Sequence, residues 1–410
     1  MLKIIGRTLL VLLVVVVLAI GYVVYQLFSQ FKKFDQVKLT NTTEVYDTLR
    51  FTYSRSGHIL VEVGIEQTGK KYPFIMDSGA SSFLFENKAE EFELESEGQA
   101  LVINSSGSFL TAPIKKMGTI QLGAAGFDDF TVKLQSFHND CGNEAYGLLG
   151  KDVMRHLIWQ INFEEQYMLM TTNEEKLTFA ENSIIVPLRE NNSSHHLYAS
   201  FMINGDSSRV SAMVDLGNNG VLSLEEKSVQ KYLPNMPRKR ILGEGSKGIG
   251  SGEGNTDEAD VLAQALVFDG TDQVFNNISI DIGPSKLNML GLGFLDQFVV
   301  SLNWDKKEMV LSPRVEEFDF SYSTYGLRTE YDEEKGQVVA RSITEGTSAE
   351  AAGIVYQDQI LAINEFEFKE LADYCAYLGV DKGDSLHVRY VHEGEEREAV
   401  VVRSRLFDVE

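Results

Sequence analysis

One short motif occurs twice in this chain: an aspartate, any residue and a glycine, placed at the end of an apolar run. The first copy is Ile75-Met76-Asp77-Ser78-Gly79 and the second is Met213-Val214-Asp215-Leu216-Gly217, so the two aspartates are 215 − 77 = 138 residues apart. A single carboxylate at the end of a buried strand is costly, but two carboxylates that meet can share one proton. The doubling therefore predicts two similar structural units that meet at their aspartates.

The similarity between the two halves extends beyond the aspartates. Leu148-Leu149-Gly150 in the first half matches Met289-Leu290-Gly291 in the second. Further on, Ile161-Asn162-Phe163 matches Leu302-Asn303-Trp304 at an offset of 302 − 161 = 141 residues. A repeat of this length indicates a duplicated domain rather than a solenoid.

The first motif and the segment that follows it resemble a known enzyme family. Asp77-Ser78-Gly79-Ala80-Ser81-Ser82, followed later by Gly147-Leu148-Leu149-Gly150, is similar to the aspartic proteases of the pepsin and retropepsin type. The resemblance covers roughly residues 45–313. It implies a mainly β, two-lobed aspartic protease fold formed by internal duplication, with lobe 1 over residues 45–180 and lobe 2 over residues 181–315.

The resemblance also implies the chemistry. Asp77 and Asp215 would hold a water between them and hydrolyse peptide bonds by general acid/base catalysis, with no covalent intermediate, no metal and no cofactor. Two carboxylates about 3 Å apart cannot both ionise, so the pair titrates as a unit. The ionised member can take a proton from water while the protonated member polarises the scissile carbonyl. The alternative is an ordinary solvated turn, since Asp-Ser-Gly is a common loop tripeptide.

The residues around the aspartates are candidates for the active-site loops. These are Ser78, Gly79, Ser82, Gly217 and Asn218. The family usually places Thr or Ser after each aspartate, where the hydroxyl helps to tie the two loops together. Ser78 fits this pattern, but Leu216 cannot form such a hydrogen bond, and Asn218 or Asn219 is a candidate to replace it.

Each lobe contains a candidate flap between its aspartate and its later glycine. In lobe 1, residues 99–104 and 109–114 flank a small-residue tip, which predicts a hairpin with Ser105, Ser106 and Gly107 at its end. In lobe 2, six glycines between Gly243 and Gly254 predict a mobile loop. Gly243 to Gly248 formally fits a dinucleotide fingerprint, but the flanking strand and helix are missing, so no nucleotide cofactor is expected.

The N-terminal segment predicts a membrane anchor. Residues 8–28 contain no charged side chain, and 21 residues at 1.5 Å each span about 30 Å, the thickness of a hydrocarbon core. We expect residues 1–34 to form a cytoplasmic stub and a transmembrane signal anchor rather than a cleaved signal peptide, because Ala19-Ile20-Gly21 is a poor cleavage site. Lys3 and Arg7 predict a cytoplasmic N-terminus, although Lys32 and Lys33 oppose it.

Composition narrows the function further. With such an anchor, the bulk of the chain is expected outside the cytoplasm, in the periplasm or at the cell surface. The formal net charge of −23 argues against nucleic-acid binding. Cys141 and Cys375 fall in different expected domains, so a disulfide is not expected. His195 and His196 lie in a polar stretch and are expected in a surface loop, and no zinc motif occurs.

The last ninety residues resemble a PDZ domain, over residues 322–405. The segments that carry this resemblance are Tyr325-Gly326-Leu327-Arg328, residues 346–354 and residues 357–364. It implies a β-sandwich or partial barrel with helices, in which an extended chain terminus binds between Tyr325 to Arg328 and a helix at residues 369–378. Arg328 replaces a residue that is more often apolar. The alternative is a module that only packs on the protease.

The sequence is therefore interpreted as a membrane-anchored aspartic endopeptidase in which a single chain forms the protease unit. Its partners would be protein or peptide substrates at the aspartates and extended termini at the PDZ groove. Two other interpretations remain. One is a non-catalytic peptide-binding protein derived from the protease fold, and the other is a membrane scaffold that acts through its PDZ domain.

Overall fold

The computed structural model describes residues 12–25, 36–103, 109–136, 141, 144–245, 257–284 and 286–407. Residues 12–25 form a helix that is exposed along its whole length. Across the described ranges, no helix is both long enough and apolar enough to cross a membrane. The remaining parts of the expected span, residues 8–11 and 26–28, lie outside those ranges.

Lobe 1 is a sheet of mostly antiparallel strands. Its strands are β1 (Lys38–Leu39), β3 (Thr52–Tyr53), β4 (Ile59–Ile65), β5 (Lys70–Asp77), β6 (Phe83–Phe85), β7 (Glu95–Ile103), β8 (Phe109–Leu122), β9 (Ala125–Gln135) and β10 (Gly147–Gly150). Strand β4 buries every second side chain from Ile59 to Ile65, as expected of a strand with one face on a core. Strand β10 runs parallel to β5 and places Gly150 opposite Asp77.

Lobe 2 repeats this strand arrangement. It contains β14 (Leu197–Ile203), β15 (Arg209–Val214), β16 (Leu222–Glu225), β17 (Arg238–Gly243), β18 (Ala259–Phe268), β19 (Val274–Gly283) and β20 (Met289–Leu290). Strand β20 runs parallel to β15 and places Leu290 opposite Val214, just before Asp215. Asp215 therefore occupies the same place in lobe 2 as Asp77 in lobe 1.

A six-stranded antiparallel sheet joins the two lobes. Its order is β2 (Tyr46–Arg50), β12 (Tyr167–Thr171), β11 (Ile158–Asn162), β21 (Phe298–Asn303), β22 (Glu308–Pro313) and β13 (Ile184–Glu190). At its centre Gln160 lies opposite Ser301, its equivalent at the offset of 141 residues, and donates to the serine hydroxyl at 3.2 Å. The repeat therefore forms an approximate two-fold arrangement. Together with the other strands, this sheet confirms the prediction of a mainly β chain.

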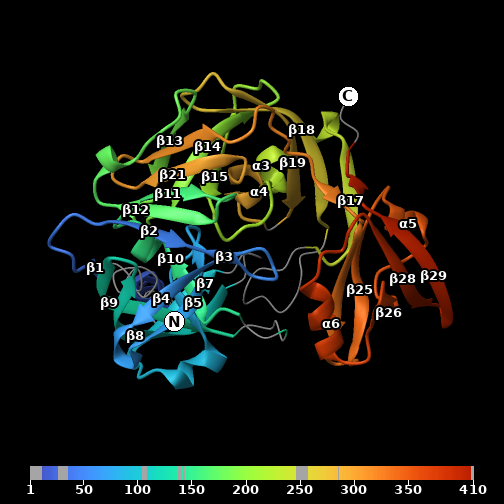
Figure 1. The fold of residues 1–410 in the computed structure, drawn as a ribbon, viewed down its shortest axis with the longest axis horizontal. Helices are drawn as coiled ribbons and strands as arrows, with labels where there is room; N and C mark the ends of the chain where they lie inside the picture. The colour runs from blue at the N-terminus through green and yellow to red at the C-terminus, as the bar shows by residue number, and fades with distance from the viewer. Residues whose placement is uncertain are drawn as a thin grey trace, which may run out of the picture.

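The C-terminal module, residues 322–405, has its own sheet and core. Its strands are β23 (Ser323–Thr324), β24 (Leu327–Asp332), β25 (Gln337–Thr344), β26 (Gln359–Ile363), β27 (Phe366–Glu367), β28 (Ser385–His392), β29 (Glu395–Val402) and β30 (Ser404–Arg405), with helices α5 (Ser348–Ala351) and α6 (Leu371–Leu378). Val338, Ile360 and Val388 are among its fully buried side chains. In Figure 1 the module, coloured orange to red, lies beside both lobes.

Strand β17 connects lobe 2 with this module. Its first half, residues 238–240, pairs with β18 of lobe 2, and its second half, residues 241–243, pairs antiparallel with β25 of the module. Figure 1 shows β17 at the junction of the two parts. Main-chain pairing of this kind fixes the register between them, so the module is docked by backbone as well as by side chains.

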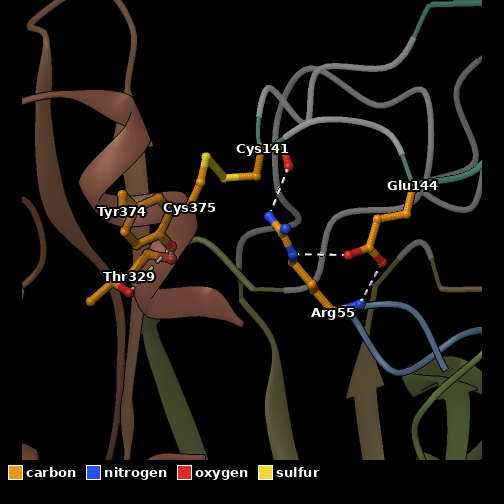
Figure 2. Close-up of a disulfide and its surroundings, with 6 residues drawn as sticks. All are labelled: Arg55, Cys141, Glu144, Thr329, Tyr374 and Cys375. Atoms are coloured by element: carbon orange, nitrogen blue, oxygen red, sulfur yellow. Dashed lines mark hydrogen bonds and ion pairs between the residues drawn. A yellow bond between two sulfur atoms is a disulfide. The ribbon is translucent and has the colours of Figure 1, made fainter. Parts of the chain in front are cut away.

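A disulfide joins the module to lobe 1, which corrects the expectation that the two cysteines stay unpaired. Cys141 of lobe 1 and Cys375 of α6 are bonded, with their Cα atoms 4.9 Å apart and 234 residues between them in sequence (Figure 2). Docking through β17 brings α6 to the side of lobe 1. Assignment to different domains says nothing about distance in space once the domains pack together.

The packing of both lobes extends past the expected bounds. Val37 is buried and β1 pairs with β9, so lobe 1 includes residues before 45. Phe318 and Phe320 pack in the core of lobe 2, where Phe320 stacks on Phe294 with ring centroids 4.6 Å apart. Lobe 2 therefore continues to about residue 320, because these aromatic side chains pack in its core.

Candidate active site

The structure brings Asp77 and Asp215 together at the contact between the two lobes. Both side chains are nearly buried, with exposed fractions of 8% and 6%, and the two carboxyl groups hydrogen-bond to each other. Gly79 and Gly217 pack against them. A Cβ atom at Gly79 would lie 2.5 Å from Cγ of Asp215, and one at Gly217 would lie 2.5 Å from Cγ of Asp77. Only glycine fits at either position.

Each aspartate also accepts a hydrogen bond within its own loop. The Gly79 amide donates to Oδ1 of Asp77 at 2.7 Å, and the Gly217 amide donates to Oδ1 of Asp215 at 2.9 Å. These matching contacts hold each carboxyl group in a defined orientation. They follow from the Asp-X-Gly spacing, which places an amide two residues after the carboxylate.

Ser78 is the residue whose hydroxyl crosses from lobe 1 to lobe 2. Its Oγ donates to the carbonyl of Val214 at 2.8 Å and accepts from the amide of Leu216 at 3.0 Å. Leu216 contributes only its backbone amide to this contact, since a leucine side chain has no polar atom. That side chain is fully buried in the core that the two lobes share. At this position a hydroxyl of the first loop contacts the backbone of the second loop, and no hydroxyl returns the contact.

Of the two asparagines that could replace a hydroxyl at position 216, Asn219 contacts the other lobe and Asn218 does not. The Asn219 amide donates to the carbonyl of Ser56 in lobe 1 at 2.5 Å. The Asn218 side chain stays within lobe 2, accepting from the Gly220 amide at 3.0 Å and donating to Ser223 at 3.3 Å. Asn219 therefore gives the second loop a cross-lobe contact several residues later than the usual position.

Several buried polar side chains hydrogen-bond to the segment that follows Asp77. Ser82 is fully buried. Its hydroxyl accepts from the Gly150 amide at 2.9 Å, and its own amide donates to Oδ1 of Asp152 at 2.7 Å. Lys151 is also buried and donates to the hydroxyl of Ser81 at 2.9 Å. Ser82 is a site residue predicted from the sequence, whereas Lys151 and Asp152 are not among the predicted ones, although two charged residues directly after an apolar Leu-Leu-Gly strand are an available signal.

Burial raises the pKa of both aspartates, and that of Asp215 most. For Asp77 the burial is opposed by the hydrogen bonds from Gly79 and Asp215 and by the charges of Lys151 and His58. For Asp215 the burial is reinforced by the charge of Asp77, which holds its pKa well above the usual range. The pair therefore shares one proton, and these directions favour Asp215 as the group that carries it.

Two histidines lie beside the pair, and one of them, His196, lies in the expected loop before β14 with its side chain next to the active site. His58 faces the charge of Asp77 and the backbone of Gly217. His196 is half-buried next to the backbone of Gly79, whereas the neighbouring His195 bonds to Glu190 at 2.6 Å. The polar composition of the stretch hid the fact that it leads into a strand of lobe 2.

Other predicted features have different outcomes. The flap residues Ser105, Ser106 and Gly107 lie outside the described residues, as does most of the glycine-rich loop after Gly245. Within the described part of the chain, no group of three or more histidine, cysteine, aspartate or glutamate side chains is placed to hold a metal ion.

The predicted terminus-binding loop of the C-terminal module is largely engaged within the protein. Gly326 adopts a positive φ of 76° against Thr347, and the Tyr325 hydroxyl donates to the carbonyl of Gly383. Leu327 packs on the module core. The charge of Arg328 faces three carboxylates of lobe 2: Asp281, Asp260 and Glu258.

The edge of β24 is partly covered by α6. The Tyr374 hydroxyl donates to the carbonyl of Thr329 at 2.7 Å, and Tyr374 directly precedes the disulfide-bonded Cys375 (Figure 2). One acceptor that an added strand would need is therefore occupied by a side chain. Tyr374 is buried at this position.

Comparison with known proteins agrees with the chemistry at Asp77. Residues 61–153 match the family model of aspartyl proteases. The matched region contains the Asp77 loop, Ser82 and the Gly147–Gly150 strand. It supports an aspartyl protease domain in this chain, and so a hydrolase that acts on protein or peptide substrates. No curated protein matches the chain.

Proposed function

We propose that this protein is an aspartic endopeptidase in which Asp77 and Asp215 of one chain form the catalytic pair. The observation that carries the proposal is the reciprocal packing of the two loops, in which each glycine lies against the aspartate of the other lobe. Two nearly buried carboxyl groups that share a proton are the arrangement required for acid/base hydrolysis. The family match to residues 61–153 supports the same assignment for the first aspartate.

The pKa directions suggest the division of roles. The ionised Asp77 takes a proton from the water, and the water oxygen attacks the scissile carbonyl carbon. Asp215 donates its proton towards the carbonyl oxygen, giving a tetrahedral diol. Breakdown of the diol transfers a proton to the leaving nitrogen and breaks the C–N bond, which yields a carboxylic acid and an amine. Lys151 and His58 favour the ionised form of Asp77.

We propose further that the protein is anchored in a membrane by residues 8–28, with the bulk of the chain outside the cytoplasm. The disulfide between Cys141 and Cys375 supports this location, because such bonds persist in oxidising compartments and are rare in the cytosol. Protease added to intact cells or spheroplasts should digest the described domains. Protection until the membrane is permeabilised would contradict the proposed orientation.

The C-terminal module is proposed to be a PDZ-like domain that selects substrates or partners by their extended termini. The order of its strands and helices, and the glycine turn that leads into β24, support this assignment. Pairing of a peptide with β24 would require the Tyr374 hydroxyl to leave the Thr329 carbonyl. Binding at this edge is therefore coupled to a movement in α6, the helix that carries Cys375.

The catalytic proposal is tested by replacing each aspartate with asparagine. Asp77→Asn and Asp215→Asn keep the side-chain shape but remove one half of the shared-proton pair, so each should abolish cleavage of a diverse peptide pool while the circular dichroism spectrum stays unchanged. A transition-state mimic of aspartic proteases should block the wild-type activity. An active Asp215→Asn protein would reject the single-chain pair, and an inactive wild-type protein would favour the non-catalytic peptide-binding interpretation.

A further inference from the structure

His58 and His196 occupy equivalent places in the two lobes. Each is 19 residues before the aspartate of its lobe, since 77 − 58 = 19 and 215 − 196 = 19. His58 directly precedes β4 and His196 directly precedes β14. These two strands pair antiparallel with β5 and β15, which lead to the aspartates.

The strand register carries each histidine to its aspartate. Leu60 lies opposite Ile75, and continuing this register by two residues brings His58 opposite Asp77. Tyr198 lies opposite Met213, and the same step brings His196 opposite Asp215. The placement is therefore a consequence of the hairpin in each lobe and not of a chance approach of two loops.

Both imidazole rings are held by the same local contact. Nδ1 of His58 lies 2.8 Å from the hydroxyl of Ser56, and Nδ1 of His196 lies 2.9 Å from the hydroxyl of Ser194. A serine hydroxyl that donates to Nδ1 leaves the ring proton on Nε2. The Ser-X-His spacing in both lobes thus holds the ring and directs Nε2 away from its own turn, and with the serine as donor this nitrogen carries the proton.

The second nitrogen of each ring is directed at the other lobe. His58 of lobe 1 faces the backbone of Gly217 in lobe 2. His196 of lobe 2 faces the backbone of Gly79 in lobe 1. Its Nε2 atom is buried and has no hydrogen-bond partner of ordinary geometry among the described residues. A buried N–H group is costly to leave without an acceptor, and the backbone of Gly79 is the group that this nitrogen faces.

We propose that His58 and His196 are positioning residues that bridge the two lobes crosswise, each holding the active-site glycine of the opposite lobe through Nε2–H and the backbone carbonyl. The bridge supplies the second loop contact that the apolar Leu216 cannot make. As a role in catalysis it rests on the proposed protease function, whereas the bridge itself can be measured without any activity.

The surroundings of the rings keep them neutral. Burial lowers the pKa of His58, opposed by the charge of Asp77. Burial also lowers the pKa of His196, to well below the usual range, and the charges of Lys151, Lys133 and His195 act in the same direction. A neutral ring with its proton on Nε2 is the form that can donate to a carbonyl at neutral pH.

The crosswise arrangement gives a readout that a merely structural role would not produce. In the full-length protein, amide hydrogen exchange followed by mass spectrometry should become faster around Gly217 in His58→Ala and faster around Gly79 in His196→Ala. His387→Ala, an exposed histidine of β28, is the control and should change neither. Faster exchange only in the lobe that carries the substitution, or no change in either loop, would overturn the bridge.

Kinetics then tests the effect on catalysis. Misplacing a catalytic loop by about 1 Å can cost on the order of 10²-fold, so each alanine variant should lose kcat to about that extent with little change in KM. His58→Gln and His196→Gln retain a side-chain N–H at a similar reach and should recover most of the loss.

The two proposals fail in different ways. Crosswise exchange in a protein that cleaves no peptide would keep the bridge and reject the protease. Glutamine variants as impaired as the alanine variants, in an active protein, would reject the bridging hydrogen bond. An unchanged kcat in both alanine variants would reject the positioning role.

Discussion

At the scale of single residues, the contact between the aspartate loops is asymmetric. Ser78 uses its hydroxyl twice across the lobe boundary, while Leu216 contributes its backbone amide and buries its side chain. The sequence already showed that position 216 lacks a hydroxyl. What it could not show is whether the leucine leaves a loose loop or fills an apolar space, because that depends on side chains from both lobes.

We expect Leu216→Thr to lower stability rather than to restore a missing hydrogen bond. The change removes apolar volume and inserts a hydroxyl into the shared core, where losses of a leucine side chain cost about 2–5 kcal/mol. Thermal unfolding followed by circular dichroism measures the effect. Leu216→Met is the matched control, since a swap of similar volume usually costs less than about 1.5 kcal/mol. A threonine variant as stable as the wild type, with higher turnover, would show that the loop accepts a polar group.

At the scale of elements, the strands that carry the site were predictable and their partners outside the repeat were not. The apolar runs before Asp77 and Asp215 and the Leu-Leu-Gly segment all lie where the duplicated pattern places them, because the repeat specifies equivalent pairings in both lobes. Strand β17 is different. Its second half pairs with β25, about a hundred residues later, and no local pattern encodes a partner at that distance.

The histidines show the same distinction in the active site. Their 19-residue spacing to the aspartates is visible in the sequence, but its meaning depends on the hairpin register that places a residue opposite the aspartate. Lys151 and Asp152 could also be read as charged residues after a buried strand. Their burial beside the Asp77 loop emerges only from packing.

A cluster of charges on β18 and β19 provides a prediction for the junction with the C-terminal module. Burial and the charge of the opposite Asp281 raise the pKa of Asp260 to about 7, partly offset by Arg328 and Lys286. The folded protein therefore binds this proton more tightly than the unfolded chain. Its contribution to stability is present at low pH and is lost as the pH rises through about 7.

Asp260→Asn should remove this dependence, because the amide stays neutral. The melting temperature of the wild-type protein should fall more steeply between about pH 4 and pH 7 than that of the variant, with the two curves converging at the acid end. The pair Asp77 and Asp215 contributes equally to the pH dependence of stability in the wild type and the variant, so the difference between the two melting curves isolates Asp260. Parallel curves would contradict the prediction.

At the scale of the whole molecule, lobe 1, lobe 2 and the C-terminal module are less separate than the sequence suggests. Phe318 and Phe320 belong to the core of lobe 2, β17 is shared with the module and Cys375 is bonded to lobe 1. Composition shifts mark a boundary near residue 315, but they do not report which side chains cross it.

Truncation experiments should reveal this sharing. The first variant ends at Ser321 and carries Cys141→Ser, which removes the unpaired thiol. It should still cleave short peptides. It should cleave a full-length protein substrate more weakly, because the missing module no longer raises the local concentration of that substrate. The same protein ending at Glu317 also loses Phe318 and Phe320, and the loss of a buried phenylalanine costs about 3–5 kcal/mol. Melting temperatures of the two should differ by several degrees. Equal cleavage of both substrates by the Ser321 protein would reject the tether.

The bond between Cys141 and Cys375 closes a covalent ring through the polypeptide. The ring runs from the first cysteine to the second and contains all of lobe 2, including Asp215. A single cut of the backbone anywhere inside it leaves one connected molecule instead of two fragments. A protease that nicks itself, or is nicked by a neighbour, would therefore keep both aspartates on one covalent body, and the cut would appear on a gel only after reduction.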